Sequence, residues 1–190
     1  MNPKFSICIP TYQNHTMLCQ LLKSIDENTV MEYEIVLNDN SFEPLGYPKA
    51  INDCIKRARG EYIVLLNDDT IVESLWLEQM YSKLISDEKI GVVGADQVRN
   101  DNWGERMVAF WCVLIPKKII DEIGLLDERF GIGTYEDNDY CKRLVNAGYK
   151  ITATHAPITH KGTQTFNRIK PMSSVISENK KTYAKKWGLN

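Results

Sequence analysis

Two acidic side chains follow a predicted buried strand and could bind a metal ion or a ribose. The run Tyr62–Leu66 is continuously apolar, and Asn67, Asp68 and Asp69 come directly after it. Carboxylate oxygens are ligands that Mn2+ and Mg2+ prefer, so Asp69 is a candidate metal ligand. Asp68 could accept hydrogen bonds from a ribose. The alternative is structural, because Asn and Asp also form turns that cap a following helix.

The residues around this acidic pair limit the chemistry further. A phosphatase of the haloacid type would need its nucleophile where this chain has Asn67. The chain contains neither Gly-x-Gly-x-x-Gly after its first strand nor Gly-x4-Gly-Lys-Ser/Thr. A bound nucleoside diphosphate would therefore need another partner for its charge. A divalent metal held by carboxylates could fill that role.

A second acidic cluster opens a predicted helix. Residues 135–140 read Tyr-Glu-Asp-Asn-Asp-Tyr, and the loop-like residues 131–134 precede them. Acidic side chains are favourable at a helix start, and Asp139 can pair with Arg143 one turn later. This structural explanation suffices for Asp139 but is weaker for three acids in four positions. Neighbouring acids near a cleft can also leave one carboxylate a better base.

His160 is a third candidate. It follows the polar tract 152–159 and precedes Lys161 and Gly162, which favours a loop. A lone histidine is more often structural than a ligand. Together with Asp69, however, it would give a mixed nitrogen and oxygen ligand set that suits Mn2+. His15 and His155 have no comparable setting.

The apolar pattern predicts a scaffold that brings these residues together. Short apolar runs alternate with amphipathic segments in the first half of the chain, which indicates a mainly parallel sheet covered on both faces. Ligands of such sheets lie beyond the carboxyl ends of the strands. The expected strands are 5–9 (ended by Pro10), 33–37, 62–66, 90–94, 108–115 and 149–154. The expected helices are 16–25, 50–58, 74–85, 117–123, 136–147 and 173–187.

Composition excludes several classes of protein. The 190 residues fit one domain, and 23 Lys and Arg against 25 Asp and Glu give a net charge of −2, which argues against a general polyanion binder. No apolar run approaches the roughly 20 residues of a membrane-spanning helix, and the start does not look like a signal peptide. We expect a cytoplasmic protein with reduced core thiols, because the five cysteines are scattered: Cys8, Cys19, Cys54, Cys112 and Cys141.

Charge is divided unevenly along the chain. Residues 1–150 carry 16 basic and 24 acidic side chains, a net of −8, whereas residues 151–190 carry seven basic and one acidic, a net of +6. A solvated helix face is the favoured interpretation of the basic tail. A phosphate contact, or a peripheral position at a membrane surface, is left open.

Five segments in order resemble the family 2 glycosyltransferases of the GT-A fold, along nearly the whole chain. They are 5–12, 35–41, 58–69, the acceptor-side segments 124–130 and 136–151, and 160–162; residues 185–188 resemble a common end of the domain. The resemblance implies one α/β domain over 1–190, with a Rossmann-like central sheet flanked by helices and a smaller acceptor-side subregion. Residues 1–95 would bind the nucleotide sugar, 96–170 would form the acceptor and catalytic half, and 171–190 would form a C-terminal helix.

The resemblance also implies roles for individual residues. Asp137 would be the catalytic base, and Asp69 with His160 would bind Mn2+ or Mg2+. The nucleotide contacts would be Thr11, Tyr12, Asp39, Asn67 and Asp68. Tentative phosphate contacts are Lys161 and Arg168, and tentative sugar or acceptor contacts are Trp103, Trp111 and Glu136. For Trp111, which lies in an apolar run, core packing is the favoured interpretation. Trp103 adjoins Asn102 and Gly104 and is the better candidate for stacking on a sugar.

Two positions depart from the family pattern. Asn67 replaces the first acid of the usual Asp-x-Asp motif, so metal binding depends on Asp69. Gln13 stands where the opening motif commonly has Asn, which could alter a contact to the nucleotide.

The resemblance predicts a metal-dependent, inverting transfer of a sugar from a UDP- or dTDP-sugar to an acceptor hydroxyl. The acceptor could be a surface glycan, a lipid-linked sugar, a protein or a modified nucleic-acid base; other nucleic acid is not expected, and homo-oligomer formation is left open. One alternative is a nucleotide-sugar-binding module without transferase activity. A sugar nucleotidyltransferase would need a glycine- and arginine-rich loop after the first strand, and residues 10–14 are not such a loop.

Overall fold

A computed structural model describes residues 3–162 and 171–189. Within them, a six-stranded sheet with the order β2-β1-β3-β8-β5-β9 forms the centre of the molecule. Only β8 is antiparallel to its neighbours, so the expected mainly parallel sheet is confirmed. The strands of this sheet are β1 (Phe5–Thr11), β2 (Tyr33–Asp39), β3 (Tyr62–Leu66), β5 (Ile90–Gly94), β8 (Cys112–Pro116) and β9 (Lys150–Ala153).

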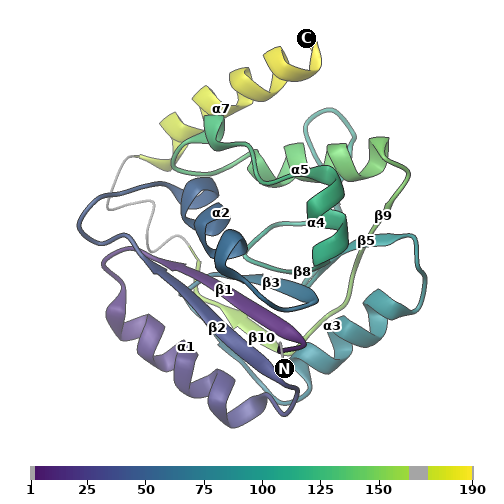
Figure 1. Cartoon of the computed structure of the whole chain (residues 1–190). Coiled ribbons are helices and arrows are strands. Elements are labelled where there is room, and N and C mark those ends of the chain that lie inside the picture. Colours follow the sequence, from purple (N-terminus) through teal and green to yellow (C-terminus); the bar gives the residue numbers. More distant parts are fainter. Residues whose placement is uncertain (1–2, 163–170, 190) are drawn as a thin grey trace.

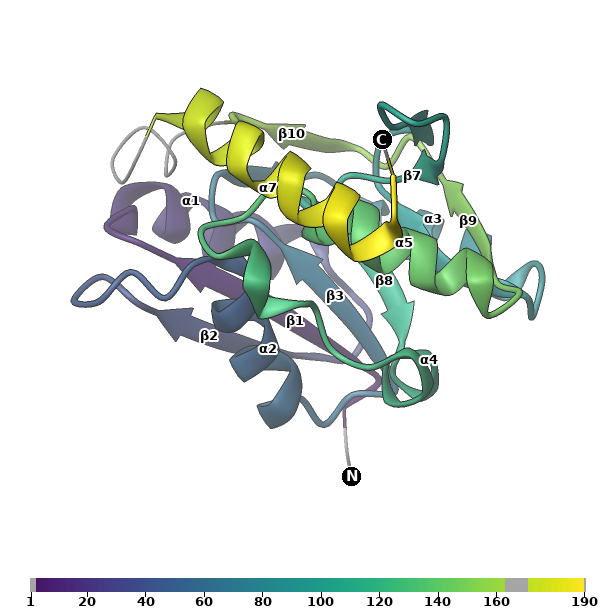
Figure 2. The same ribbon diagram turned by 90° about the horizontal axis from the view of Figure 1, so that it is seen from above.

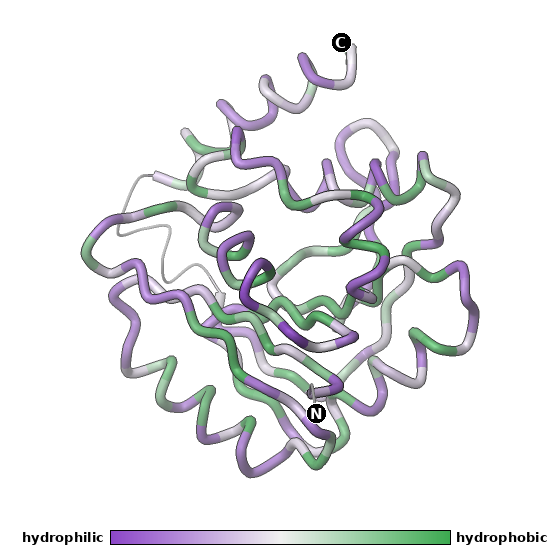
Figure 3. The backbone as a smooth tube through the Cα atoms, viewed as in Figure 1, coloured by the Kyte–Doolittle hydropathy of each residue, from purple (hydrophilic) through white to green (hydrophobic). Residues whose placement is uncertain are grey.

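Helices cover both faces of the sheet (Figure 1). One face packs against α1 (His15–Asn28) and α3 (Trp76–Ile85), and the other against α2 (Tyr47–Arg57), α4 (Lys117–Ile123) and α5 (Glu136–Asn146). Each face therefore has its own apolar core. The backbone coloured by hydropathy shows this arrangement, with hydrophobic strands at the centre and mixed helices outside (Figure 3). Burying both faces explains why these strands are continuously apolar.

Smaller elements complete the acceptor-side half. The last helix, α7 (Met172–Trp187), crosses over α5 on the outside of the molecule (Figure 2). A 3-10 turn, η1 (Glu128–Phe130), precedes α5. Two short antiparallel pairs lie outside the main sheet: β4 (Thr70–Val72) with β10 (Ile158–His160), and β6 (Arg99–Asn100) with β7 (Arg106–Met107).

The structure corrects three local expectations. β1 continues through Pro10 to Thr11, because β3 pairs with β1 only as far as Cys8, so one side of β1 needs no N–H donor at the proline. The residues after Asp69 form β4 rather than a helix, so the interpretation of Asn67–Asp69 as a helix cap is wrong. His160 ends the strand β10 and does not lie in a loop.

The prediction of core thiols is confirmed for four of the five cysteines. All five are free thiols; Cys19 is exposed and the other four are buried. Across residues 3–162 and 171–189, we find no helix that combines the length and apolar character needed to cross a membrane.

Candidate functional site

Asp68 ties together the carboxyl ends of two neighbouring strands. Thr11 at the end of β1 donates a hydrogen bond from Oγ1 to Asp68 Oδ2 over 2.6 Å. Asn14, just before α1, donates from Nδ2 to Asp68 Oδ1 over 3.1 Å. All three residues are buried. Because Asn14 makes this bond, its side chain does not cap α1. The predicted nucleotide residues Thr11 and Asp68 therefore lie together and hold the loop after β1 against the end of β3.

Asp39 lies beside Thr11 in the register of β1 and β2 and is exposed at the sheet edge. Ser41 donates to Asp39 Oδ1 from its hydroxyl at 2.5 Å and its backbone N–H at 3.0 Å. His15 Nε2 lies 3.2 Å from Asp39 Oδ2. The Ser41 hydroxyl, more than any other group, lowers the pKa of Asp39. Asp39 is thus an anionic hydrogen-bond acceptor at the open edge of the sheet.

Tyr12 and Gln13 lie at the same edge of the sheet. Gln13 donates from its backbone N–H to Ser41 Oγ over 2.9 Å, and from Nε2 to the Tyr12 hydroxyl over 3.3 Å. The residue that departs from the family pattern therefore bridges the loops after β1 and β2. It adopts a left-handed backbone with φ of 51°.

Asp69 and His160 are brought together by the pairing of β4 with β10. His160 pairs with Thr70, and Lys161 donates its backbone N–H to the Asp69 carbonyl over 2.9 Å. His160 Nε2 lies 3.2 Å from Asp69 Oδ1. The His160 ring stacks on Trp111, with centroids 4.8 Å apart and planes 13° apart. The two metal ligands expected from the sequence thus occupy one place, and Trp111 fixes the imidazole plane.

The geometry of this pair fits a divalent metal. Apart from the His160 contact, the buried Asp69 Oδ1 has no hydrogen-bond partner among the described residues, and the buried Asn67 Oδ1 has none. Two adjacent ligands of an octahedral ion with bonds of about 2.1 Å stand about 3 Å apart, close to the separation of Asp69 Oδ1 and His160 Nε2. No group of three or more His, Cys, Asp or Glu side chains placed to hold a metal occurs in the described part of the chain. The remaining ligand positions would therefore belong to substrate or water.

Glu136 and Asp137 begin α5 as an adjacent acidic pair. Glu136 is buried, and its Oε2 has no hydrogen-bond partner. Burial, together with the nearby Asp137, raises the pKa of Glu136 well above its ordinary value. Burial raises the pKa of Asp137 to about 6, although hydrogen bonds from backbone N–H groups lower it in part. Asp137 therefore has the raised pKa of a general base that works near neutral pH.

One short segment connects the acidic pair with the metal pair. The backbone at Phe110 hydrogen-bonds to Asp137, and the next residue, Trp111, stacks on His160. Trp111 also accepts the backbone N–H of Asn67 over 2.8 Å. The candidate base and one candidate metal ligand therefore contact consecutive residues, Phe110 and Trp111.

The loop before the acidic pair is held in an unfavourable backbone conformation. Thr134 and Tyr135 have φ of 74° and 67°, a region that non-glycine residues adopt at a cost of about 1–3 kcal/mol each. Asn179 of α7 is buried, and its Nδ2 lies 2.8, 2.6 and 3.1 Å from the carbonyl oxygens of Phe130, Gly133 and Thr134. The Asn179 side chain therefore fixes the loop that positions the acidic pair.

The opposite side of this loop is held by α2. Gly46, with φ of 80°, precedes α2, and a Cβ there would lie 2.1 Å from the Gly131 carbonyl oxygen. Tyr47 donates its backbone N–H to the Ile132 carbonyl and its hydroxyl to the Phe110 carbonyl over 2.5 Å. Only glycine permits this close approach at position 46.

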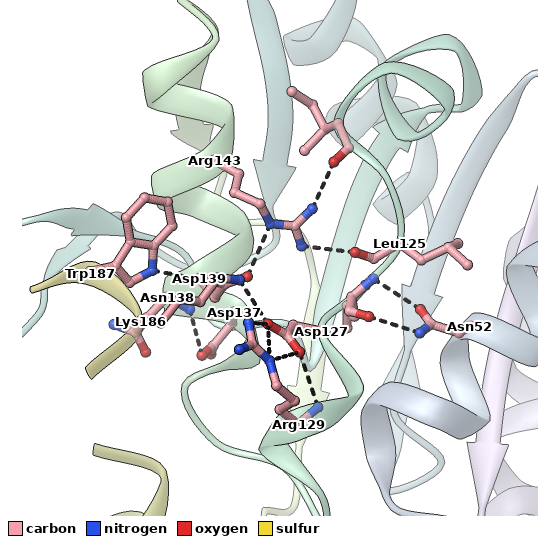
Figure 4. A network of polar contacts seen from close by, with 12 residues as sticks. Asn52, Leu125, Asp127, Arg129, Asp137, Asn138, Asp139, Arg143, Lys186 and Trp187 are labelled. Carbon is pink, nitrogen blue, oxygen red and sulfur yellow. Dashed lines mark hydrogen bonds and ion pairs between the residues drawn. The ribbon is translucent and has the colours of Figure 1, made fainter. Parts of the chain in front are cut away.

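The end of α7 is joined to α5 by a buried charge network (Figure 4). Lys186 Nζ lies 2.6 Å from Asp139 Oδ1 and 2.8 Å from Asp127 Oδ2. Trp187 donates from Nε1 to Asp139 over 3.0 Å, and Arg143 does so from Nε over 3.0 Å. Asp139 has no exposed surface. The expected Asp139–Arg143 pair is confirmed, whereas the expectation of a solvated helix face is wrong for Lys186.

The remaining predicted residues divide between the site and its surroundings. Trp111 lies at the site, but Trp103 packs against Tyr135 and Tyr183, with centroids 6.3 and 5.3 Å away. Lys161 is exposed and held beside Asp69 through its backbone. Arg168 lies outside the described residues.

Sequence reasoning missed several residues that shape the site. The Asn at position 14, just before a helix, carried a signal, but of capping rather than of a bond to Asp68. Ser41 lies in the family-like segment 35–41, but no role was predicted for it. The contacts of Tyr47, Asn179 and Lys186 join segments far apart in the chain, and no local pattern indicates them. His15 gained a role only through its closeness to Asp39.

Comparison of the sequence with known proteins finds glycosyltransferases. The sequence model described as "Glycosyl transferase family 2" matches residues 41–135. The uncharacterized glycosyltransferase YwdF of Bacillus subtilis (strain 168) is 29% identical over an alignment covering 43% of this chain and 38% of that protein.

Two solved structures share the fold at low sequence identity. The mannosyltransferase PcManGT from Pyrobaculum calidifontis, in complex with GDP-Man and Mn2+, superposes with a TM-score of 0.66 at 15% identity, covering 81% of this chain and 55% of that one. Residues 1–349 of S. aureus TarS, in complex with UDP-GlcNAc, give 0.68 at 14% identity, covering 95% and 65%. The chain thus spans less than two thirds of each relative. The expected GT-A fold is confirmed, and the chain belongs to glycosyl transferase family 2.

Proposed function

We propose that this protein transfers a sugar from a nucleoside diphosphate donor to an acceptor hydroxyl, with inversion at the anomeric carbon. One observation carries the proposal: a carboxylate with a raised pKa, Asp137, and the candidate metal pair, Asp69 and His160, are linked through the consecutive residues Phe110 and Trp111. A single displacement requires a base for the acceptor and a site for the leaving diphosphate. Inversion needs one such displacement and no covalent nucleophile.

Asp137 acts as the base. It accepts the proton of the acceptor hydroxyl while that oxygen forms a bond to the anomeric carbon of the donor. The bond from the anomeric carbon to the diphosphate oxygen breaks, and the diphosphate leaves with the electron pair. Glu136 stays protonated at higher pH than an ordinary Glu, because burial and Asp137 raise its pKa. One member of the acidic pair therefore stays neutral while the other carries the negative charge.

The donor binds along the ends of β1, β2 and β3. Asp39 accepts a hydrogen bond from the nucleotide base of the donor. Tyr12, Thr11 and Asp68 form the wall beside the nucleoside. Asp69 and His160, with Asn67 beside them, would hold Mn2+ or Mg2+. When bound, the ion supplies positive charge to stabilise the departing diphosphate.

The donor and the setting of the reaction are part of the same proposal. PcManGT and TarS were solved with GDP-Man and UDP-GlcNAc, respectively. For this chain we propose UDP- or dTDP-sugars and a role in glycan synthesis. The free thiols, four of them buried, support a cytoplasmic location.

A donor screen tests this function. The full chain is incubated with UDP-, dTDP- and GDP-sugars and Mn2+, and release of the nucleoside diphosphate is measured with and without mixed glycan acceptors. Release that requires Asp137 and rises with acceptor supports the proposal. Donor affinity with no release on any acceptor would instead indicate a binding module without transferase activity. No affinity for any donor would contradict both.

A further inference from the structure

A pocket of about 340 Å³ opens beside Asp137. The strands β6 and β7, the start of α5 and the first half of α7 all contribute to its walls. Its volume is at the lower end of the roughly 300–1,000 Å³ typical of small-ligand sites. Since Asp137 is part of the lining, whatever enters the pocket reaches the candidate base.

Three amide residues contribute to the polar lining. Asn100, Asn102 and Asn138 come from β6, the β6–β7 turn and α5. An amide both donates and accepts hydrogen bonds, so it matches a hydroxyl in either direction. Asn102 donates from Nδ2 to the Tyr135 hydroxyl over 2.7 Å, which fixes the orientation of its amide group. The apolar side chains of Met107 and Ile176 complete the wall. Amides combined with an apolar surface suit a sugar ring, which presents both hydroxyl and C–H groups.

The charge of the pocket selects against an anion. Asp101 and Asp137 are its ionisable carboxylates, and among the described residues that line it there is no Lys, Arg or His. A phosphate or carboxylate on the acceptor would stand beside these acids without a counter-charge. Such like-charge contact is unfavourable, and each new anion would also raise the pKa of the base further.

Two nearby cations have acidic partners. Arg99 pairs with Asp96 at 2.6 Å, and Lys142 pairs with Glu105 at 2.9 Å. Arg106 is the cationic residue to test, because it stands opposite Asn100 in the register of β6 and β7.

We propose that this pocket binds an uncharged sugar unit of the acceptor, and that Asn102 and Asn138 recognise its hydroxyls. The inference depends on the proposed transferase function, because Asp137 must receive the acceptor proton. It excludes acceptors whose reacting unit is a phosphate or a uronic acid.

Matched pairs of ligands test the charge selection. Saturation-transfer NMR compares p-nitrophenyl glucoside with p-nitrophenyl glucuronide, and galactoside with galacturonide, on the full chain. We expect saturation of the neutral member of at least one pair and none of its charged partner. Stronger saturation of the charged members would overturn the proposal. So would the absence of saturation for every ligand. This experiment needs no turnover, so its failure is separate from failure of the donor screen.

Variants then locate the binding. Asn138→Ala removes the amide but keeps the backbone N–H that bonds to Asp137 at 2.9 Å, so the base keeps that contact. We expect Asn138→Ala and Asn102→Ala to weaken binding of the neutral glycoside by about tenfold each, the effect of one lost hydrogen bond of about 1.5 kcal/mol. Asn146→Ala, an exposed change at the far end of α5, is the matched control. Unchanged binding in both pocket variants, or loss of binding in Arg106→Gln comparable to theirs, would contradict the proposed recognition.

Discussion

The two sides of the candidate site are built in different ways. On the donor side, Thr11 and Asp39 are cross-strand partners at the ends of β1 and β2, and His160 reaches Asp69 through the pairing of β10 with β4. Strand register places these side chains. On the acceptor side, the start of α5 is held by side chains from α7 and by the approach of Gly46.

This difference has an energetic consequence. Backbone ladders that align the donor side are distributed over many hydrogen bonds, so no single side chain decides their position. The acceptor-side loop contains Thr134 and Tyr135 in a costly backbone conformation, and Asn179 is among the side chains that keep it there. We therefore expect donor-side substitutions to change binding chemistry and acceptor-side substitutions to change geometry and stability as well.

The largest effect is expected from the base itself. Asp137→Asn should lower kcat by about 10²–10⁴-fold, the usual contribution of a general base, while donor affinity measured by calorimetry stays within twofold. Substantial transfer by this variant would remove Asp137 from the mechanism.

The pH profile sharpens the same prediction. The pKa of Asp137 is about 6, and the base must be deprotonated to act. Transfer should therefore rise with pH through about 6 and level off above it. The residual activity of Asp137→Asn should lose this pH dependence. If the variant keeps the rise near pH 6, another group is responsible for it.

The next effect tests the donor side. Asp69→Asn and His160→Ala should weaken metal-dependent donor binding by at least the 10–100-fold typical of a lost outer-shell metal partner. EDTA should reduce wild-type binding but change little in Asp69→Asn. Calorimetry with and without Mn2+ measures both. Wild-type affinity that is insensitive to EDTA would contradict the metal assignment while leaving the base prediction intact.

A smaller effect tests the network between α7 and α5. Lys186→Met should reduce the free energy of unfolding by about 1–3 kcal/mol, below the full cost of breaking a buried ion pair, because Arg143 and Arg129 remain beside Asp139 and Asp127. Denaturant titration measures the change. Lys185→Met, an exposed change on the preceding residue, should shift stability by under about 0.5 kcal/mol. Equal effects of the two variants would show that the network does not stabilise the fold.

The network also predicts a pH dependence of stability. Arg129 first, and then Lys186, hold the pKa of Asp127 well below its ordinary value. A carboxyl whose pKa is lowered on folding stabilises the protein above its unfolded pKa of about 3.9, and this contribution is lost as pH falls. The difference in stability between wild type and Lys186→Met should therefore shrink below about pH 4.

The smallest effect is expected at Asp39. It is exposed, so Asp39→Ala should reduce the preference between donor bases by about two- to tenfold, the value of one ordinary hydrogen bond, without lowering kcat for the preferred donor. Competition between UDP- and GDP-sugars measures the preference. A loss of kcat instead would move Asp39 from base recognition into catalysis.

The elements of the central sheet could largely be predicted from the sequence. The runs 62–66 and 90–94 were placed to the residue, because a strand buried on both faces must be continuously apolar. The short strands β4, β6, β7 and β10 were missed or read as polar tracts. Two or three residues carry too little periodicity to be distinguished from loop.

The candidate site was predictable to the level of its chemical groups. Asp69 and His160, proposed as partners from residue type and resemblance, lie 3.2 Å apart. The preference for Trp103 over Trp111 as a sugar platform did not anticipate their environments. Trp103 lies in an aromatic cluster with Tyr183, and Trp111 stacks on His160. The difference depends on which distant element each ring meets.

The sequence alone therefore determined the alternation of strands and helices, the acidic groups at the strand ends, and the family. These features follow from local periodicity and from motifs a few residues long. Only the tertiary structure decided that Asn179 and Lys186 of α7 hold the loop and helix that carry the candidate base, and that Asp137 has a raised pKa. It also decided that the pocket beside Asp137 has amides and carboxylates but no described cation. Burial and long-range side-chain contacts set those properties, and neither is encoded in any short stretch of the chain.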